Sequence, residues 1–152
     1  MYKRQDPHDA LVRLVQSGVR PLLAVAAGYY PIRKVLIAYS GSMESAKTMK
    51  HFVQMRLFDN PQVRIVSFDD GGKHGPALVA EAADYCRAHG LTVETDVVAG
   101  SPQRQLLPYS EQWGADLTVI GNSAKNLLLR RVFGETALNA IRTANRPLFL
   151  AQ

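Results

Sequence analysis

The stretch LTVIGNSAKNLLLRRVFGET, from Leu117 to Thr136, decides how this chain folds. Its first residues are apolar and partly β-branched, and Gly121 ends them, which predicts a short buried strand of a parallel sheet. A polar loop follows, and Gly134-Glu135-Thr136 begins a helix that Pro147 ends. A strand, a loop of small residues and a helix N-terminus can hold a phosphate through backbone N–H groups and the helix dipole. The same pattern also fits an ordinary strand-to-helix connection, because lone glycines are common in such loops.

The spacing of small residues in this stretch resembles a family signature. Gly121-x-x-Ala124, nine residues, then Gly134-Glu135-Thr136 is similar to the G-x-x-G-x9-G-[S/T] signature of the universal stress protein family. The segment Asn126–Arg131, NLLLRR, resembles the basic, leucine-rich turn usually found inside that signature. Two positions differ, because Ala124 stands where the family has its second glycine and Glu135 where it has serine or threonine. In the family this loop wraps the triphosphate of ATP, so both differences bear on function.

Composition places the chain among ordinary globular domains. Its 152 residues are 47% hydrophobic and 20% charged, which suits one domain with a buried core. No stretch approaches the ~18 uninterrupted apolar residues that span a bilayer, so we expect no membrane insertion. Asp6, His8 and Asp9 interrupt any apolar signal-peptide region, so we expect a cytoplasmic protein. A single cysteine, Cys86, excludes an intrachain disulfide, and its place in a helical pattern predicts a packing role.

The net charge of +5 is mostly scattered along the sequence. Lys125, Arg130 and Arg131 form the one local basic cluster near the candidate phosphate loop, where they can face a phosphate or water. No arginine-rich tract, zinc-finger spacing or RNA-binding aromatic motif occurs, so we expect no nucleic-acid partner.

Catalytic and metal-binding motifs find little support in the sequence. The four histidines are dispersed, and H-E-x-x-H, G-x-S-x-G and C-x-x-C are all missing, so we expect no catalytic residue and no metal. Asp69, Asp70 and His74 come close together after a predicted strand, and we interpret them as a solvated turn.

Strand and helix patterns alternate along the rest of the chain. Ser42 is placed to cap the first helix with Glu44 in its first turn, and Ser101 is placed to cap the third. The alternation predicts an α/β fold with a doubly wound parallel sheet of five strands. Ligands bind such sheets beyond the carboxyl ends of the strands, which puts Ser40 beside Gly121. The predicted strands are Lys34–Tyr39, Val63–Phe68, Thr92–Ala99, the segment from Leu117 to Gly121, and Leu148–Ala151.

The likeness to the universal stress protein family covers residues 32–152 and implies more than the pattern alone. It implies strand order 3-2-1-4-5, counting the five predicted strands along the chain, and an adenine nucleotide alpha hydrolase-like fold. It also implies a homodimer that pairs the last strands of two copies. We therefore expect a homodimer through residues 148–151, and we keep a protein partner as a further route of action.

Residues 1–27 resemble the end of the chain. Ala10-Leu11-x-x-Leu14 followed by Arg20-Pro21-Leu22-Leu23-Ala24 parallels Ala137-Leu138-x-x-Ile141 followed by Arg146-Pro147-Leu148-Phe149-Leu150, with a one-residue gap. Both segments read as a helix, a connector and a strand. We interpret residues 1–27 as a helix-strand extension like the tail of a preceding repeat, and we expect the segment Asp9–Val25 to lie against the final strand of this chain or of a partner. A coincidental extension is the alternative.

The resemblance also points to a nucleotide site. Nucleotide-binding members of the family typically have an aspartate at the end of the first strand, where this chain has Ser40, and they contact the base through the backbone of the second strand, here at Phe68. A serine can bond ribose but lacks the charge of a carboxylate. Ala124 adds a Cβ to the cradle, and the Glu135 carboxylate would repel a phosphate at a helix N-terminus. If ATP is retained as a ligand, the site residues are Ala38, Ser40, Phe68, Gly121, Asn122, Ser123, Ala124, Gly134, Glu135 and Thr136.

We interpret the chain as a non-catalytic regulatory domain of the stress response with a degraded ATP site, which acts through dimerisation or a protein partner. Two alternatives remain open. One is a switch that still binds ATP or another adenine nucleotide. The other is an adenylating enzyme, because SGSMES at residues 40–45 resembles the S-G-G-x-D-S pyrophosphate loop of the ATP pyrophosphatases, with Ser42 in place of the second glycine and Glu44 in place of the aspartate.

Overall fold

A computed structural model of the chain describes residues 21–25, 28, 31–69, 73–121 and 146–151. Between residues 34 and 121, strands and helices alternate as the sequence predicts. The elements are β1 (Leu22–Ala24), β2 (Lys34–Ala38), α2 (Met43–Met55), β3 (Gln62–Phe68), α3 (Gly75–Ala88), β4 (Thr92–Val98), α4 (Pro102–Trp113), β5 (Leu117–Gly121) and β6 (Leu148–Ala151).

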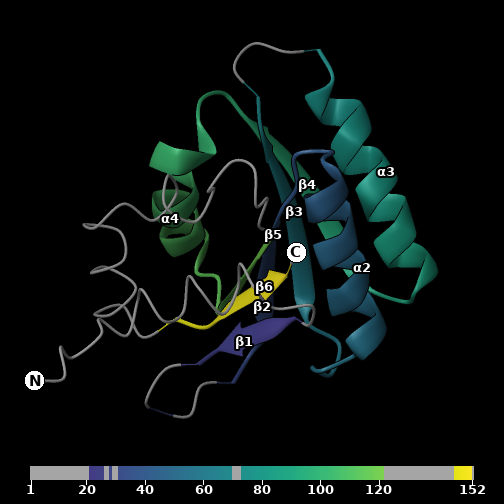
Figure 1. Cartoon of the computed structure of the whole chain (residues 1–152), viewed down its shortest axis with the longest axis vertical. Helices are drawn as coiled ribbons and strands as arrows, with labels where there is room; N and C mark the ends of the chain where they lie inside the picture. Colours follow the sequence, from purple (N-terminus) through teal and green to yellow (C-terminus); the bar gives the residue numbers. More distant parts are fainter. Residues whose placement is uncertain (1–20, 26–27, 29–30, 70–72, 122–145, 152) are drawn as a thin grey trace, which may run out of the picture.

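The strands form one sheet in the order β1-β6-β5-β2-β3-β4. The five strands from β2 to β6 are mutually parallel, and their order is the predicted 3-2-1-4-5 when they are counted along the chain. Helices α2 and α3 cover one face of the sheet and α4 covers the other (Figure 1). The predicted doubly wound α/β fold is therefore confirmed.

A sixth strand, the one expected in the N-terminal extension, adds to the five parallel strands. Strand β1 pairs antiparallel with β6, with Leu22 opposite Leu150, Leu23 opposite Phe149 and Ala24 opposite Leu148. The expectation that the segment ending at Val25 lies against the final strand is confirmed for residues 22–24. The helix expected before it lies outside the described residues.

Most predicted boundaries hold within a residue or two. The first strand of the parallel set ends at Ala38 and not at Tyr39, and the third ends at Val98 and not at Ala99. Ser42 caps α2 as predicted, because its hydroxyl accepts the N–H of Ser45 at 3.1 Å. Ser101 takes the N-cap position of α4 but makes no side-chain capping bond.

Asp116 sets the register between β2 and β5. Its carboxylate accepts the backbone N–H groups of Arg33 at 3.0 Å and Lys34 at 2.8 Å, and its own N–H donates to the carbonyl of Lys34. These bonds fix where the two central strands begin, so the positions of their carboxyl ends follow from their lengths.

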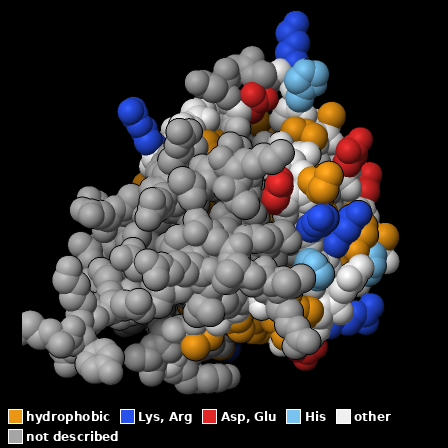
Figure 2. Space-filling model, in the orientation of Figure 1, with side chains coloured by type: hydrophobic (Ala, Val, Ile, Leu, Met, Phe, Trp, Pro, Cys, Tyr) orange, Lys and Arg blue, Asp and Glu red, His pale blue; other side chains and the backbone are white. Residues whose placement is uncertain are grey.

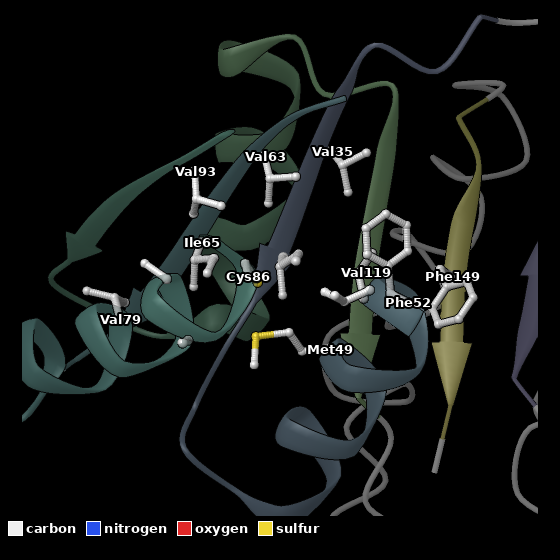
Figure 3. Packing of buried hydrophobic residues seen from close by; sticks show 14 of the residues in the cluster. Val35, Met49, Phe52, Val63, Ile65, Val79, Cys86, Val93, Val119 and Phe149 are labelled. Carbon is white, nitrogen blue, oxygen red and sulfur yellow. The ribbon is translucent and has the colours of Figure 1, made fainter. Parts of the chain in front are cut away.

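The core has two layers, one on each face of the sheet. On the face of α2 and α3, Phe52 meets Phe149 edge to face with ring centroids 5.6 Å apart (Figure 3). Cys86 lies fully buried in this layer, which confirms its predicted packing role. On the other face, Leu106 of α4 packs in a cluster with strand residues that include Leu36. The two layers therefore cover both faces of the sheet.

The described surface is mixed in character. Figure 2 shows basic, acidic and hydrophobic side chains interspersed over the described part of one face. Among the helices of the described ranges, none has the length and apolar run needed to cross a membrane.

Candidate functional site

The structure brings Ser40 and Gly121 together at the carboxyl edge of the sheet, as predicted. Both residues adjoin Ser45 in the first turn of α2. The hydroxyl of Ser40 lies 3.4 Å from that of Ser45, and a β-carbon placed on Gly121 would stand 2.8 Å from the Cα of Ser45. The ends of β2 and β5 and the N-terminus of α2 therefore meet at one point, where the strand order reverses.

Three serines form a hydrogen-bonded cluster at this point. Ser40 Oγ donates to Ser42 Oγ at 3.0 Å, and Ser45 Oγ donates to the carbonyl of Ser42 at 2.9 Å. The backbone N–H of Ser42 donates back to Ser40 Oγ at 3.3 Å. Ser40 and Ser42 are exposed, whereas Ser45 is 5% exposed. The cluster is neutral and its hydroxyls are already engaged with one another.

The N-terminus of α2 is largely satisfied by its own residues. Ser42 caps the N–H of Ser45, and Glu44 places an acidic residue in the first turn, where it complements the helix dipole. An incoming anion would have to replace the bond to Ser42 and tolerate the charge of Glu44. The helix end is therefore a weaker anion site than an uncapped one would be.

Phe68 ends the strand beside β2 and faces the same crevice with its backbone. The carbonyl of Val66 accepts the N–H of Tyr39 at 2.9 Å, so Val66 directs its backbone groups toward β2. Backbone direction alternates along a parallel strand, so Phe68 directs its groups to the same side, beyond the end of β2. Its half-buried ring meets Tyr109 of α4 edge to face at 6.1 Å. Ala38, the last residue of β2, packs against the cluster beneath α4.

A polar network that the sequence did not single out lies below Phe68. Tyr109 Oη donates to an Asp96 carboxylate oxygen at 2.6 Å and accepts from Arg64 at 3.1 Å. Arg64 also bonds and ion-pairs with Glu94 at 3.0 Å, and its guanidinium lies 4.6 Å from the ring centroid of Trp113. The network joins β3 and β4 to α4.

Two tyrosines near the crevice have raised pKa values. The pKa of Tyr109 is raised to about 12, mainly by burial, with the bond to Asp96 adding to the rise and Arg64 opposing it. Burial also raises the pKa of Tyr39, and the charge of Glu81 adds to this effect. Both phenols are therefore neutral hydrogen-bond donors at physiological pH.

Other residues at this edge were missed by sequence reasoning. Leu78 of α3 packs against the turn after β2, because a β-carbon on Gly41 would stand 2.8 Å from its Cδ2. Gly41 has a φ of +77°, a conformation that favours glycine. Ser45 entered the sequence analysis only as the last residue of SGSMES, and its bonds to Ser40 and Ser42 were not predicted, although a second serine three residues after the N-cap was a visible signal. Leu78 gave no signal, because its contact depends on how α3 packs.

The second half of the predicted site lies outside the described residues. This holds for Asn122, Ser123, Ala124, Gly134, Glu135 and Thr136, and for the basic residues Lys125, Arg130 and Arg131. Asp69 accepts the backbone N–H of Gly75 at 3.2 Å, so it takes part in the start of α3. Within the ranges that the structure describes, no group of three or more histidine, cysteine, aspartate or glutamate side chains is placed to hold a metal.

Comparison with known proteins assigns the family. The sequence profile described as the universal stress protein family matches residues 66–152. This match covers more than half of the chain, and the chain belongs to the universal stress protein family. The family resemblance expected from the glycine spacing is thereby confirmed.

Individual relatives are distant. A universal stress protein of Synechocystis sp. is 22% identical over 138 residues, which are 90% of this chain and 48% of that protein. A crystal structure of a universal stress protein in complex with cAMP is 23% identical, with a TM-score of 0.64 over 81% of this chain and 98% of that chain. One from Archaeoglobus fulgidus is 18% identical, with a TM-score of 0.68 over 93% of this chain and 52% of that chain. This chain thus spans about half the length of two of these three proteins, and the structural matches show the fold alone.

Proposed function

We propose that this chain is a non-catalytic regulatory domain of the stress response whose adenine-nucleotide site has lost affinity, and that it acts through self-association or a protein partner. One observation carries the proposal. At the end of β2, the residue that would meet a ribose is Ser40, a neutral side chain whose hydroxyl is bonded to Ser42.

The chemistry of ribose binding supports this reading. A carboxylate accepts two strong hydrogen bonds from a ribose diol because it is ionised, whereas a serine hydroxyl has no charge to offer. Ser40 would also have to give up its bond to Ser42 in order to donate to a ligand. Glu135 and Ala124 add to the argument from the sequence, since neither suits a phosphate cradle.

An adenine-nucleotide switch is the second candidate function. Its support is that the edge of the sheet keeps the required form, with Gly121 against α2 and the backbone of Phe68 facing the crevice. One structural neighbour was also crystallised in complex with cAMP. At 23% identity that neighbour shares the fold of this chain, and the affinity of this chain for a nucleotide has to be measured.

Calorimetric titration with ATP and Mg²⁺, with AMP and with cAMP tests the first proposal. We expect the dissociation constant of the wild-type chain to be weaker than ~1 mM for each ligand. Ser40→Asp restores an ionised acceptor, and because hydrogen bonds to charged groups contribute about 1.5–3 kcal/mol, it should tighten ATP or AMP binding at least about tenfold. Ser101→Asp is the matched control, because it adds the same charge at the N-cap of α4 after a different strand, and we expect no gain.

The opposite results have clear meanings. Micromolar binding by the wild-type chain would overturn the degraded site, and weakening of that binding by Gly134→Val would support the switch. Release of pyrophosphate from ATP in the presence of an acceptor would overturn the non-catalytic reading and support the adenylating enzyme.

A further inference from the structure

Strands β1 and β6 carry the same short sequence. Residues 20–24 read RPLLA and residues 146–150 read RPLFL, so Leu23 is the counterpart of Phe149. In the sheet these two counterparts lie opposite each other. The flanking pairs are Leu22 with Leu150 and Ala24 with Leu148. In the two like sequences Leu22 corresponds to Leu148 and Ala24 corresponds to Leu150. Each flanking residue of β1 therefore faces the counterpart of the other flanking residue of β1.

This register is the one that two identical strands adopt across a twofold axis. When two identical antiparallel strands are related by a twofold axis, the residue at the axis lies opposite the same residue of the other strand. The residue before it then lies opposite the residue after it in the other strand. Leu23 therefore stands where Phe149 of a second copy would stand. Strand β1 occupies, within one chain, the place of another copy's last strand.

Strand β1 is held only weakly at the edge of β6. It has three residues, and Leu23 is 37% exposed whereas Phe149 is 1% exposed. Val25, directly after the strand, is 71% exposed. A strand of three residues makes few backbone hydrogen bonds to its neighbour, and such a segment opens at low free energy. Opening would leave the apolar edge of β6 unpaired, which is a template for another strand.

We propose that β1 is an intramolecular stand-in for the last strand of a second copy of this chain, and that its release lets two copies pair β6 with β6, Phe149 opposite Phe149. The proposal rests on the self-association part of the proposed function and names the contact and the segment that controls it. Figure 1 shows β1 lying along the outer edge of β6, so the two arrangements exclude each other.

One structural comparison extends beyond the five-stranded part of the chain. Residues 32–152 make up about four fifths of the chain, so a match to 93% of it must include part of the segment before residue 32. That match is to a protein chain of which only 52% is covered. The structure that is itself 98% covered matches only 81% of this chain. Of these two solved structures, the longer protein therefore matches the larger share of this chain.

The direction of the backbone hydrogen bonds shows which residue of β1 should be substituted to weaken its pairing with β6. The N–H of Thr118 in β5 donates to the carbonyl of Pro147, so Pro147 faces β5. Backbone direction alternates along β6, so Phe149 also faces β5, while Leu148 and Leu150 face β1. Their partners Ala24 and Leu22 therefore carry the bonds that hold β1, and the N–H of Leu23 points away from β6.

Sedimentation equilibrium of full-length variants tests the proposal. Ala24→Pro removes an N–H that bonds to β6, and we expect its dimer dissociation constant to be at least tenfold lower than that of the wild-type chain. Leu23→Pro is the matched control one residue away, and we expect it to resemble the wild type, because its lost N–H points outward. Adding Leu150→Pro to Ala24→Pro removes an N–H of β6 that the second copy needs, and should abolish the dimer.

Ala24→Gly keeps the proposal testable if Ala24→Pro fails to fold. Glycine weakens a strand without removing a bond, so we expect a smaller shift in the same direction. The proposal is overturned if neither variant at position 24 dimerises more than wild type, or if Leu150→Pro leaves the dimer intact. Such a failure leaves the nucleotide titrations unaffected, so the two proposals fail separately.

Discussion

Gly121, at the end of β5, lies directly against the backbone of Glu44 in the first turn of α2. A β-carbon at position 121 would stand 2.8 Å from both the carbonyl carbon and the carbonyl oxygen of Glu44. Carbon atoms in favourable contact are ~3.5–4.0 Å apart, so this approach requires glycine. The contact explains why a glycine follows the apolar strand, whether or not the loop after it holds a phosphate.

Replacing Gly121 by alanine should therefore destabilise the fold. The added methyl group meets backbone atoms, which cannot rotate aside, and overpacking of this kind costs about 1–3 kcal/mol of unfolding free energy. Urea denaturation measures the loss. Gly28→Ala is the control, because a β-carbon there meets nothing within 4 Å, and its effect should stay within about 0.5 kcal/mol. Equal stability of both variants would contradict the close contact.

The bridging hydroxyl of Tyr109 gives a second prediction. Tyr109→Phe leaves Asp96 without its 2.6 Å bond and Arg64 without its 3.1 Å bond, while the ring and its contact with Phe68 remain. We expect a loss of about 1–2 kcal/mol in unfolding free energy. Tyr85→Phe is the matched control, because that hydroxyl accepts one exposed bond at 3.5 Å from Gln54. A loss for Tyr85→Phe as large as for Tyr109→Phe would show that the network contributes nothing special.

The buried thiol of Cys86 predicts a loss of stability at alkaline pH. Burial raises the pKa of Cys86 to about 11 from an ordinary value of 9.0. A raised pKa in the folded state means that folding favours the neutral thiol, so this contribution is complete below pH 9 and is lost as the pH rises to about 11. In urea titrations between pH 8 and 11, the wild-type chain should lose more unfolding free energy than Cys86→Ala. Parallel curves for the two proteins would contradict the prediction.

Sequence pattern determined the parallel sheet, and the resemblance to the universal stress protein family supplied the order of its strands. Apolar runs such as Val35–Ile37 belong on a central strand because they are covered on both faces, and the alternation with helices leaves few topologies. The spacing of Gly121 and Gly134 identified the family, and a serine before a helical pattern identified the cap at Ser42. Each of these signals is local, since it depends on residues that are close together in the chain.

Tertiary structure decided which residues of different elements contact one another. The Tyr109 network and the contact of Gly121 with Glu44 join elements whose relative placement no local pattern encodes. The sequence showed that the chain's two ends are alike. Only the register of β1 against β6 revealed that Leu23 faces its own counterpart, because strand register depends on two segments more than a hundred residues apart.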